Sequence, residues 1–181
     1  IVGTRVESIP AQVPYLFPLG RPPRALAREP GVRNVGLVWA GGPAHKKDHL
    51  RSVKFAEMSA LLQTPGCRFH SLQVGPRAGD CADAAARGAI VDLAPSLGDF
   101  FDTALQMQQL DLVISIDTAV AHLAGALGVP VWILIPFTPD WRWGTTGATS
   151  AWYPTAKLFR QKTRGDWSSV IADVARELAA G

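Results

Sequence analysis

The chain has 181 residues, of which 48% are apolar and 18% are charged. This is the length and composition of one folded domain and excludes a disordered tail. Eighteen Lys and Arg against 15 Asp and Glu leave a formal net charge of +3, which is too small to predict a general nucleic-acid-binding protein. Residues 45–54 (HKKDHLRSVK) hold four basic residues and one acidic residue, so this segment alone accounts for the whole excess. The charge therefore predicts a small anionic ligand near one loop.

The cysteines and the hydropathy of the sequence indicate where in the cell the protein is expected. Cys67 and Cys81 are not in a CxxC pair, which predicts two reduced thiols. No apolar run reaches the roughly 18 residues of a membrane span, and no signal peptide is visible. We therefore expect a cytoplasmic protein without a membrane span. Because the chain starts at Ile1 rather than Met, we expect it to be a piece of a longer protein.

Residues 1–31 are predicted to be irregular. Six prolines recur through them, and proline removes a backbone donor and interrupts helices and strands. We expect an extended arm or inter-domain linker, which packs on the domain through Val13, Tyr15, Leu16 and Phe17.

From residue 32 onward, short apolar runs alternate with helical patterns. In chain order they predict a strand at 35–40, a helix at 55–62, a strand at 68–74, a helix at 78–87, a strand at 89–93, a helix at 97–109, a strand at 111–116, a helix at 118–127, strands at 131–135 and 157–161, and a helix at 167–180. This alternation predicts an α/β domain over 32–181, with a Rossmann-like parallel sheet of about six strands and helices on both faces. Such sheets bind ligands beyond the carboxyl ends of their strands.

The segment SIDTAVAH at 115–122 is the most specific local pattern. A strand ends at Ile116 and a helix begins at Asp117 or Thr118, where small residues leave backbone N–H groups uncovered. Such a helix start binds anions through its N–H groups and dipole. His122 lies four residues after Thr118, so both can face one anion. The alternative is an ordinary helix cap followed by a packed histidine.

The basic segment follows the first strand and therefore lies at the same sheet edge. Lys46, Lys47 and Arg51 have the charge to neutralise a diphosphate, and Ser52 is expected to cap the next helix and touch phosphate. The alternative is a solvated charged loop. Neither GxxxxGK[ST] nor GxGxxG is present. Two histidines lie four residues apart here without a third ligand, so no metal site is expected.

The segment 136–154 (PFTPDWRWGTTGATSAWYP) gathers three of the six tryptophans. Aromatic and polar side chains in this pattern, Asp140 and Trp141 among them, suit contact with a base or a sugar face. A domain interface or a small local core explains them equally well. Gln73, at the end of the second strand, and Ser96, after the third strand, are weaker candidates for ligand contacts.

Four stretches together resemble a known family: VGLVWAGGPAHKKDHLRS, FHSLQVGP, LVISIDTAVAHLAGALGVPVWILIPFTPDWRW and WYPTAKLFRQ. They resemble the carboxyl-terminal, glycosyltransferase-like region of bacterial tetratricopeptide-repeat proteins. That region is similar to the nucleotide-sugar-binding half of the heptosyltransferase group, glycosyltransferase family 9, and more distantly to the O-linked N-acetylglucosamine transferases. The resemblance covers about residues 32–181.

The resemblance implies one half of a GT-B architecture that binds a nucleotide-sugar donor without a metal. Asp117, Thr118, Ala119 and His122 match the family's D-[ST]-G-x-x-H phosphate motif, with Ala119 in place of the usual Gly. Lys47 or Arg51 falls where the family has a phosphate-binding Lys. The acceptor and the general base are then expected on a missing amino-terminal domain or beside helical repeats, so the chain alone is expected to bind a donor but not to transfer the sugar.

Two functions remain open from the sequence. The first is the donor-binding half of a glycosyltransferase that stabilises the leaving diphosphate. The second is a degenerate, non-catalytic transferase domain that serves as a binding or interaction module. The nucleotide, sugar and acceptor are not identified by these residues.

Overall fold

One parallel sheet organises the structure, a computed structural model that describes residues 3 and 5–180. Within these residues the sheet has six strands: β1 (Arg33–Val38), β2 (Cys67–Ser71), β3 (Val91–Asp92), β4 (Leu112–Ile116), β5 (Val131–Ile135) and β6 (Ala156–Arg160). Their order is β3-β2-β1-β4-β5-β6, and every neighbouring pair is parallel. The predicted α/β, Rossmann-like sheet is therefore confirmed.

The strand order changes direction between β1 and β4. The chain proceeds outward from β1 to β3, returns, and then proceeds from β4 to β6 on the other side. In the pairing of β1 with β4, Val38 lies opposite Ser115. The loops that follow these two strands therefore leave the same edge of the sheet side by side.

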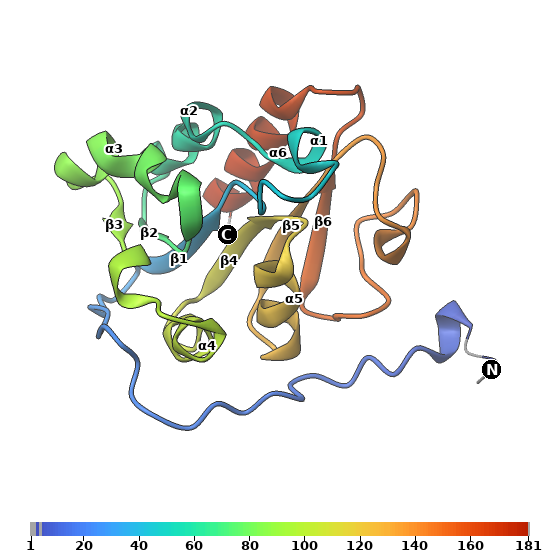
Figure 1. The fold of residues 1–181 in the computed structure, drawn as a ribbon, viewed down its shortest axis with the longest axis horizontal. Helices are drawn as coiled ribbons and strands as arrows, with labels where there is room; N and C mark the ends of the chain where they lie inside the picture. The colour runs from blue at the N-terminus through green and yellow to red at the C-terminus, as the bar shows by residue number, and fades with distance from the viewer. Residues whose placement is uncertain (1–2, 4, 181) are drawn as a thin grey trace.

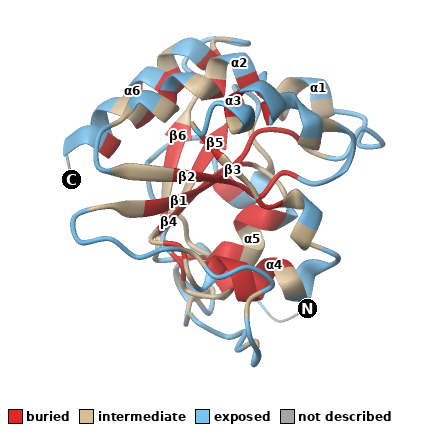
Figure 2. Ribbon diagram, turned by 90° about the vertical axis from the view of Figure 1, so that its left-hand side faces the viewer, coloured by how far each residue is buried: buried red, intermediate tan, exposed pale blue. Residues whose placement is uncertain are grey.

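Helices cover both faces of the sheet (Figures 1 and 2). The described helices are α1 (Asp48–Arg51), α2 (Phe55–Met58), α3 (Ala82–Ala86), α4 (Phe100–Met107), α5 (Ala119–Ala126) and α6 (Trp167–Ala180). Helices α2, α3 and α6 lie on one face, and α4 and α5 lie on the other (Figure 1).

Alternating side chains of the central strands supply two cores. In β4, Leu112 and Ile114 pack toward α2 and α6, whereas Val113 packs toward α4 and α5. All three are nearly inaccessible to water, and the buried residues follow the sheet and the inner faces of the helices (Figure 2). Burial on both faces explains why these strands are continuous apolar runs in the sequence.

Several element boundaries differ from the predictions. Helix α1 lies inside the segment predicted as a loop, and the helix predicted at 55–62 is α2 followed by a 3-10 turn at Ser59–Gln63. The helix predicted at 78–87 is a 3-10 segment at Gly75–Cys81 followed by α3. The helix predicted at 97–109 begins later, because the Asp99 carboxylate accepts hydrogen bonds from two backbone N–H groups of the first turn of α4.

The amino-terminal segment runs along the α4 and α5 side of the domain (Figure 1). The backbone N–H groups of Tyr15 and Leu16 both donate to the Ala126 carbonyl, at 2.9 and 3.2 Å. Val13 packs against the core on this side. The expected packing of Tyr15, Leu16 and Phe17 is wrong in part, because these three side chains remain 53%, 44% and 69% exposed. The segment is held mainly through its backbone.

Neither cysteine forms a disulfide within the described part of the chain, where Cys67 is half-buried and Cys81 is buried. Across residues 3 and 5–180, no helix has the length and apolar character to cross a membrane.

Candidate functional site

The candidate site is a cavity of about 1040 Å³ at the carboxyl edge of the sheet. It lies where the loops after β1, β4 and β5 meet, at the change of strand direction between β1 and β4. Open parallel sheets bind ligands at this position. The volume suits a ligand of nucleotide-sugar size.

Three segments far apart in the sequence line the cavity. The loop after β1 contributes His45, Lys46, Lys47 and Arg51. The start of α5 contributes Asp117, Thr118, Ala119 and His122. The segment after β5 contributes Pro136, Thr138, Asp140, Trp141 and Arg142. The fold therefore brings together the two predicted anion-binding elements and part of the aromatic segment.

The start of α5 is open to an anion. Thr118 is the N-cap residue and has an extended backbone, yet within the described residues no side chain caps this helix. The first intrahelical bonds run from the N–H groups of Ala121 and His122 to the Thr118 carbonyl, at 3.0 and 3.4 Å. Among the described residues, the N–H groups before them have no hydrogen-bond partner, and they lie at the positive end of the helix dipole. They point a partial positive charge into the cavity.

Arg51 joins the loop after β1 to the start of α5. Its Nη1 donates to the Asp117 carbonyl at 2.8 Å, and its Nε donates to the Asp48 carboxylate at 3.3 Å. The side chains of Arg51 and Asp48 are each only 18% exposed. Arg51 therefore braces the loop after β1 against the start of α5.

Ser52 and Asp48 complete this brace. The Ser52 hydroxyl accepts from the Gly41 N–H at 3.1 Å and donates to the Asp48 carboxylate at 3.0 Å. A Cβ on Gly41 would lie 2.3 Å from an Asp48 oxygen and 2.6 Å from an Arg51 nitrogen, so a larger residue there would displace these two side chains. Asp48 was missed by sequence reasoning, although the glycine pair before a charged loop was a signal for close backbone packing.

Lys46 and Lys47 differ from Arg51 in their surroundings. Both side chains are exposed. Neither ammonium group has an ion-pair partner among the residues that the structure describes. These two lysines are therefore available to an anionic ligand in the cavity.

His122 is held by two aromatic side chains from the segment after β5. Its ring stacks on Trp143, with centroids 5.0 Å apart, and its Nδ1 lies 3.0 Å from the Tyr153 hydroxyl. Burial lowers the pKa of His122, while the charge of Asp117 acts in the opposite direction. The imidazole is therefore neutral around pH 7.

The aromatic side chains of residues 136–154 have two different roles. Trp143 and Tyr153 are buried beside His122 and form the small local core. Trp141 is 70% exposed, and the Arg142 guanidinium lies 4.9 Å from its ring centroid. Trp141 therefore keeps a surface for a ligand, whereas the other two support the histidine.

Asp140 lines the same cavity, but its carboxylate is already hydrogen-bonded to Arg142. Its carboxylate accepts from the Arg142 N–H at 3.1 Å and from the Arg142 guanidinium at 2.8 Å. Burial raises the pKa of Asp140, but the Arg142 hydrogen bonds and charge outweigh it and hold the pKa below its usual value. Asp140 therefore stays ionised.

Two predicted contact residues lie outside the cavity. The Gln73 amide accepts from the N–H groups of Trp39 and Ala40 and donates to the carbonyls of Ala40 and Val74. The Ser96 hydroxyl donates to the Leu93 carbonyl at 2.8 Å. Gln73 holds Trp39 and Ala40, the two residues that follow β1, and Ser96 stabilises a 3-10 turn.

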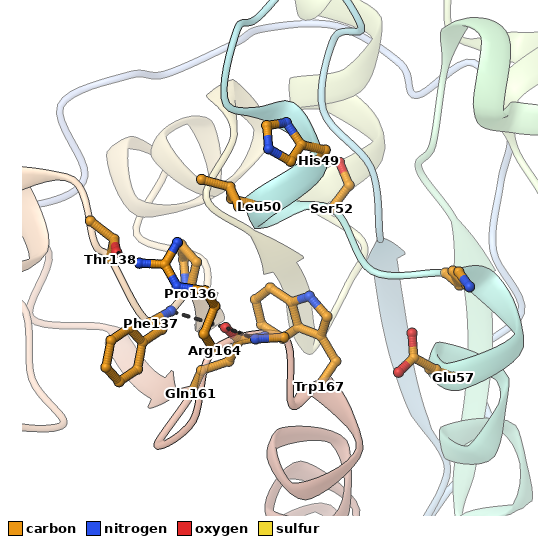
Figure 3. Close-up of a pocket in the computed structure, with 12 residues that line it drawn as sticks. His49, Leu50, Ser52, Glu57, Pro136, Phe137, Thr138, Gln161, Arg164 and Trp167 are labelled. Carbon is orange, nitrogen blue, oxygen red and sulfur yellow. Dashed lines mark hydrogen bonds between the residues drawn. The ribbon is translucent and has the colours of Figure 1, made fainter.

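A smaller pocket of about 290 Å³ adjoins the cavity and shares Leu50, Pro136 and Thr138 with it. Ser52 lines this smaller pocket rather than the larger cavity, together with His49 and Trp167 (Figure 3). The side-chain amide oxygen of Gln161 accepts from the backbone N–H groups of Phe137 and Gly165, at 3.0 and 3.3 Å. These bonds tie the loop after β5 to the start of α6.

Residues 3 and 5–180 contain no group of three or more His, Cys, Asp or Glu side chains arranged to hold a metal ion.

Comparisons with known proteins agree with this architecture. Protein FlbA of Caulobacter vibrioides is 29% identical over 153 residues, which are 82% of this chain and 25% of FlbA. The structure of the E. coli ADP-heptose LPS heptosyltransferase II matches with a TM-score of 0.53 at 17% identity, over 84% of this chain and 47% of that one.

Two further solved structures share the fold. E. coli heptosyltransferase WaaC with ADP matches with a TM-score of 0.58 at 14% identity, over 82% of this chain and 45% of that one. The glycosyltransferase family 9 protein of Veillonella parvula matches with a TM-score of 0.57 at 14% identity, over 84% and 48%. The chain thus spans less than half the length of these relatives. The family model for glycosyltransferase family 9 (heptosyltransferase) matches residues 41–164, which include the cavity, and the chain belongs to this family.

Proposed function

We propose that this chain is the donor-binding half of a glycosyltransferase and holds the diphosphate of a nucleotide sugar. The observation that carries the proposal is the meeting of the uncapped α5 start, His122, Lys46 and Lys47 in one cavity. Unoccupied N–H groups at a helix start and mobile ammonium groups are the donors that a diphosphate requires.

The proposed roles within the site follow from the partners that each residue already has. The α5 N–H groups, the Thr118 hydroxyl and His122 contact one phosphate, and Lys47 or Lys46 contacts the other. Arg51 acts mainly as the brace between the two elements, because two directions of its guanidinium are already occupied. We assign the charge of the diphosphate to these groups and include no metal ion in the proposal.

The proposed reaction is glycosyl transfer from the donor to an acceptor hydroxyl. The bond between the sugar C1 and the diphosphate oxygen breaks, and its electron pair leaves with the nucleoside diphosphate. The acceptor oxygen forms the new bond to C1 as a base takes its proton. Fixed donors at the leaving oxygen lower the barrier because negative charge grows there in the transition state.

The base and acceptor site are proposed to lie outside this chain. Asp140 is a poor base because Arg142 stabilises its ionised form. The chain covers less than half of the solved family structures. We therefore propose that an amino-terminal domain, or a helical-repeat region, supplies the acceptor, and that this chain by itself binds the donor without transferring the sugar.

The sugar and nucleoside contacts are proposed on the segment after β5. Trp141 offers an exposed ring at the cavity, and the neighbouring Asp140 oxygens are oriented by Arg142. An exposed aromatic ring beside a fixed carboxylate suits the apolar face and hydroxyl groups of a sugar. Gln73 and Ser96 have no part in this proposal, because both bond to the fold itself.

Binding of ADP, UDP and GDP to the whole chain, measured by calorimetry, tests the proposal. We expect at least one nucleotide to bind, with ADP as the first probe. Thr118→Ala and His122→Ala should each weaken binding roughly tenfold, the cost of one hydrogen bond to a charged group. Ser59→Ala is the matched control, because this hydroxyl bonds the Ala56 carbonyl after α2, on the other face of the sheet.

The alternative is a non-catalytic transferase domain, and Ala119 is the residue that favours it. Its methyl group stands where the family motif has glycine and restricts how closely a phosphate approaches the helix start. If no nucleotide binds, or if the two site variants bind as tightly as the unchanged chain, the donor-binding proposal is wrong. Ala119→Gly should tighten nucleotide binding if the cavity still serves a donor.

A further inference from the structure

Tyr153 contacts His122 but is not part of the family motif. Its hydroxyl lies 3.0 Å from Nδ1 of His122, and the two rings meet edge to face at 5.8 Å. Tyr153 is 7% exposed and belongs to the irregular segment between β5 and β6. It is 31 positions away from His122 in the sequence. The contact is therefore made only by the folded chain.

The fold provides a specific space for the Tyr153 ring. A Cβ on Gly125, in the last turn of α5, would lie 2.4–2.8 Å from three atoms of this ring. Any other residue at position 125 would push Tyr153 away from the helix. Because Gly125 lies one turn after His122 on the same helix, it allows the phenol to reach the imidazole.

The remaining nitrogen of His122 is available to a ligand. His122 lines the cavity, and Nε2 is neither buried nor hydrogen-bonded among the residues that the structure describes. A neutral imidazole carries its hydrogen on only one nitrogen. A phosphate oxygen at Nε2 requires the hydrogen there, and Nδ1 must then accept a hydrogen bond. The Tyr153 hydroxyl is placed to donate it.

We infer that Tyr153 is a positioning residue that donates its hydroxyl hydrogen to Nδ1 of His122 and fixes the imidazole with N–H at Nε2, toward the donor phosphate. This inference rests on the proposed function.

The charged groups around His122 are Asp117 at the start of α5 and Asp140 and Arg142 in the segment after β5. Burial is the largest influence and lowers the pKa of His122. Asp117 and Asp140 raise it, and Arg142 lowers it. Above pH 7 the imidazole is neutral, so its binding strength depends on which nitrogen carries the hydrogen rather than on its charge.

Nitrogen NMR of the histidine rings tests the inference without any ligand. The chain has four histidines, and His122→Gln assigns the signals of His122. At pH 7.5 we expect the hydrogen on Nε2 and an Nδ1 signal typical of a hydrogen-bond acceptor. In Tyr153→Phe the Nδ1 signal should move to the value of an unbonded nitrogen, and the form with hydrogen on Nδ1 should appear. Hydrogen on Nδ1 in the unchanged chain, or an Nδ1 signal that Tyr153→Phe does not move, overturns the inference.

A double-mutant cycle on ADP binding provides the second test. Tyr153→Phe should weaken binding about five- to tenfold, but less than about twofold in the His122→Ala background, because Tyr153 acts through His122. Between pH 7.0 and 8.5 the affinity of the unchanged chain should vary less than about twofold, since the imidazole is already neutral. An equal loss in both backgrounds overturns the inference. If the unchanged chain binds none of ADP, UDP and GDP, the proposed function fails, and the NMR result still decides the role of Tyr153.

Discussion

Single residues with no functional group set the geometry of the site. Gly125 leaves space for the Tyr153 ring, and Gly41 leaves space for the Asp48 carboxylate that holds Arg51 and Ser52. In both cases a methyl group would overlap atoms of a residue that supports the cavity. The small side chains around the family motif are therefore packing requirements as much as contacts to a ligand.

Gly125→Ala should destabilise the chain, although the same change in an open helix stabilises it. In a helix interior alanine gains roughly 0.5–1 kcal/mol over glycine. Here its Cβ would lie 2.4 Å from the Tyr153 ring, and such overpacking costs about 1–3 kcal/mol. Urea unfolding measures the difference. Gly79→Ala is the control, because a Cβ there has no atom within 4 Å among the described residues. A Gly125→Ala chain as stable as the control would refute this account.

Substitutions at Arg51 and Lys47 should distinguish a residue that braces the fold from a residue that contacts the ligand. Arg51→Lys keeps the charge but loses the two-directional bonding to the Asp117 carbonyl and Asp48. We expect it to lower the free energy of unfolding by about 1–2 kcal/mol and to weaken ADP binding. Lys47→Ala should weaken ADP binding without changing stability, because its side chain is exposed. Unfolding and calorimetry on both variants check this. Equal effects on stability would show that the roles are not separate.

Two helices of equal length begin in opposite ways. Helix α4 is capped by Asp99, whose carboxylate accepts from the N–H groups of Phe101 and Asp102, at 2.8 and 2.9 Å. Within the described residues α5 has no capping side chain, and the Thr118 hydroxyl lies instead 3.3 Å from that of Ser115. The first N–H groups of α4 are bonded to the Asp99 carboxylate. The first N–H groups of α5 have no capping side chain among the described residues and remain available to a ligand.

Substitutions at these two N-cap positions should have opposite effects. Asp99→Ala should lower the free energy of unfolding by about 1 kcal/mol, the usual value of a helix cap, without affecting ADP binding. Thr118→Ala should change the free energy of unfolding by less than about 0.5 kcal/mol but weaken ADP binding. Thermal unfolding and calorimetry on the same two proteins provide the comparison. A large loss of stability in Thr118→Ala would indicate that Thr118 serves the fold.

The sequence predicted the elements better than their ends. The strand at 131–135 and the helix at 167–180 coincide with β5 and α6, because buried strands and amphipathic helices have a clear hydrophobic period. Helix α1 was missed, since it has only four residues and no buried ones. Its position depends on the contact of Arg51 with the distant Asp117 carbonyl, which leaves no periodic pattern.

At the scale of the whole molecule, strand order places the cavity. Strands β1 and β4 are about 75 positions apart in the sequence, as in the pairing of Leu37 with Ile114, and they are direct neighbours in the sheet. Their carboxyl ends bring the basic loop and the start of α5 to one edge. The net positive charge of the chain is thereby concentrated opposite an uncapped helix, which is the arrangement that a diphosphate requires.

A buried histidine away from the cavity should make the stability of the whole domain depend on pH. His70 is 1% exposed, and its Nε2 lies 2.9 Å from the Asn34 side-chain oxygen. Burial, assisted by the charges of Arg68 and Arg24, lowers the pKa of His70 to about 4. Between pH 6.5 and 4 the unfolded chain binds a proton at this residue and the folded chain does not, so stability falls as the pH falls.

From pH 7.5 to 5 this residue should remove about 2 kcal/mol from the free energy of unfolding. His70→Gln should be less stable at pH 7.5 but should lose less stability on acidification, because it lacks the titrating group. Urea unfolding of both proteins at the two pH values measures the difference, and the shared titration of carboxylates and of His122 cancels in it. Parallel losses in the two proteins would contradict the prediction.

Local sequence patterns predicted the α/β alternation and the two segments that meet at the carboxyl edge of the sheet. Both follow from local patterns, and parallel strands place their carboxyl ends together. Only the tertiary structure decided what individual residues do there. In the folded chain Gln73 bonds the residues that follow β1 and lies outside the cavity. Arg51 donates a hydrogen bond to the Asp117 carbonyl, whereas the Lys47 side chain remains exposed. The fold also brings Tyr153 to His122 through the space at Gly125. These roles depend on contacts between segments that are far apart in the sequence, and the local hydrophobic periodicity of the chain does not indicate such contacts.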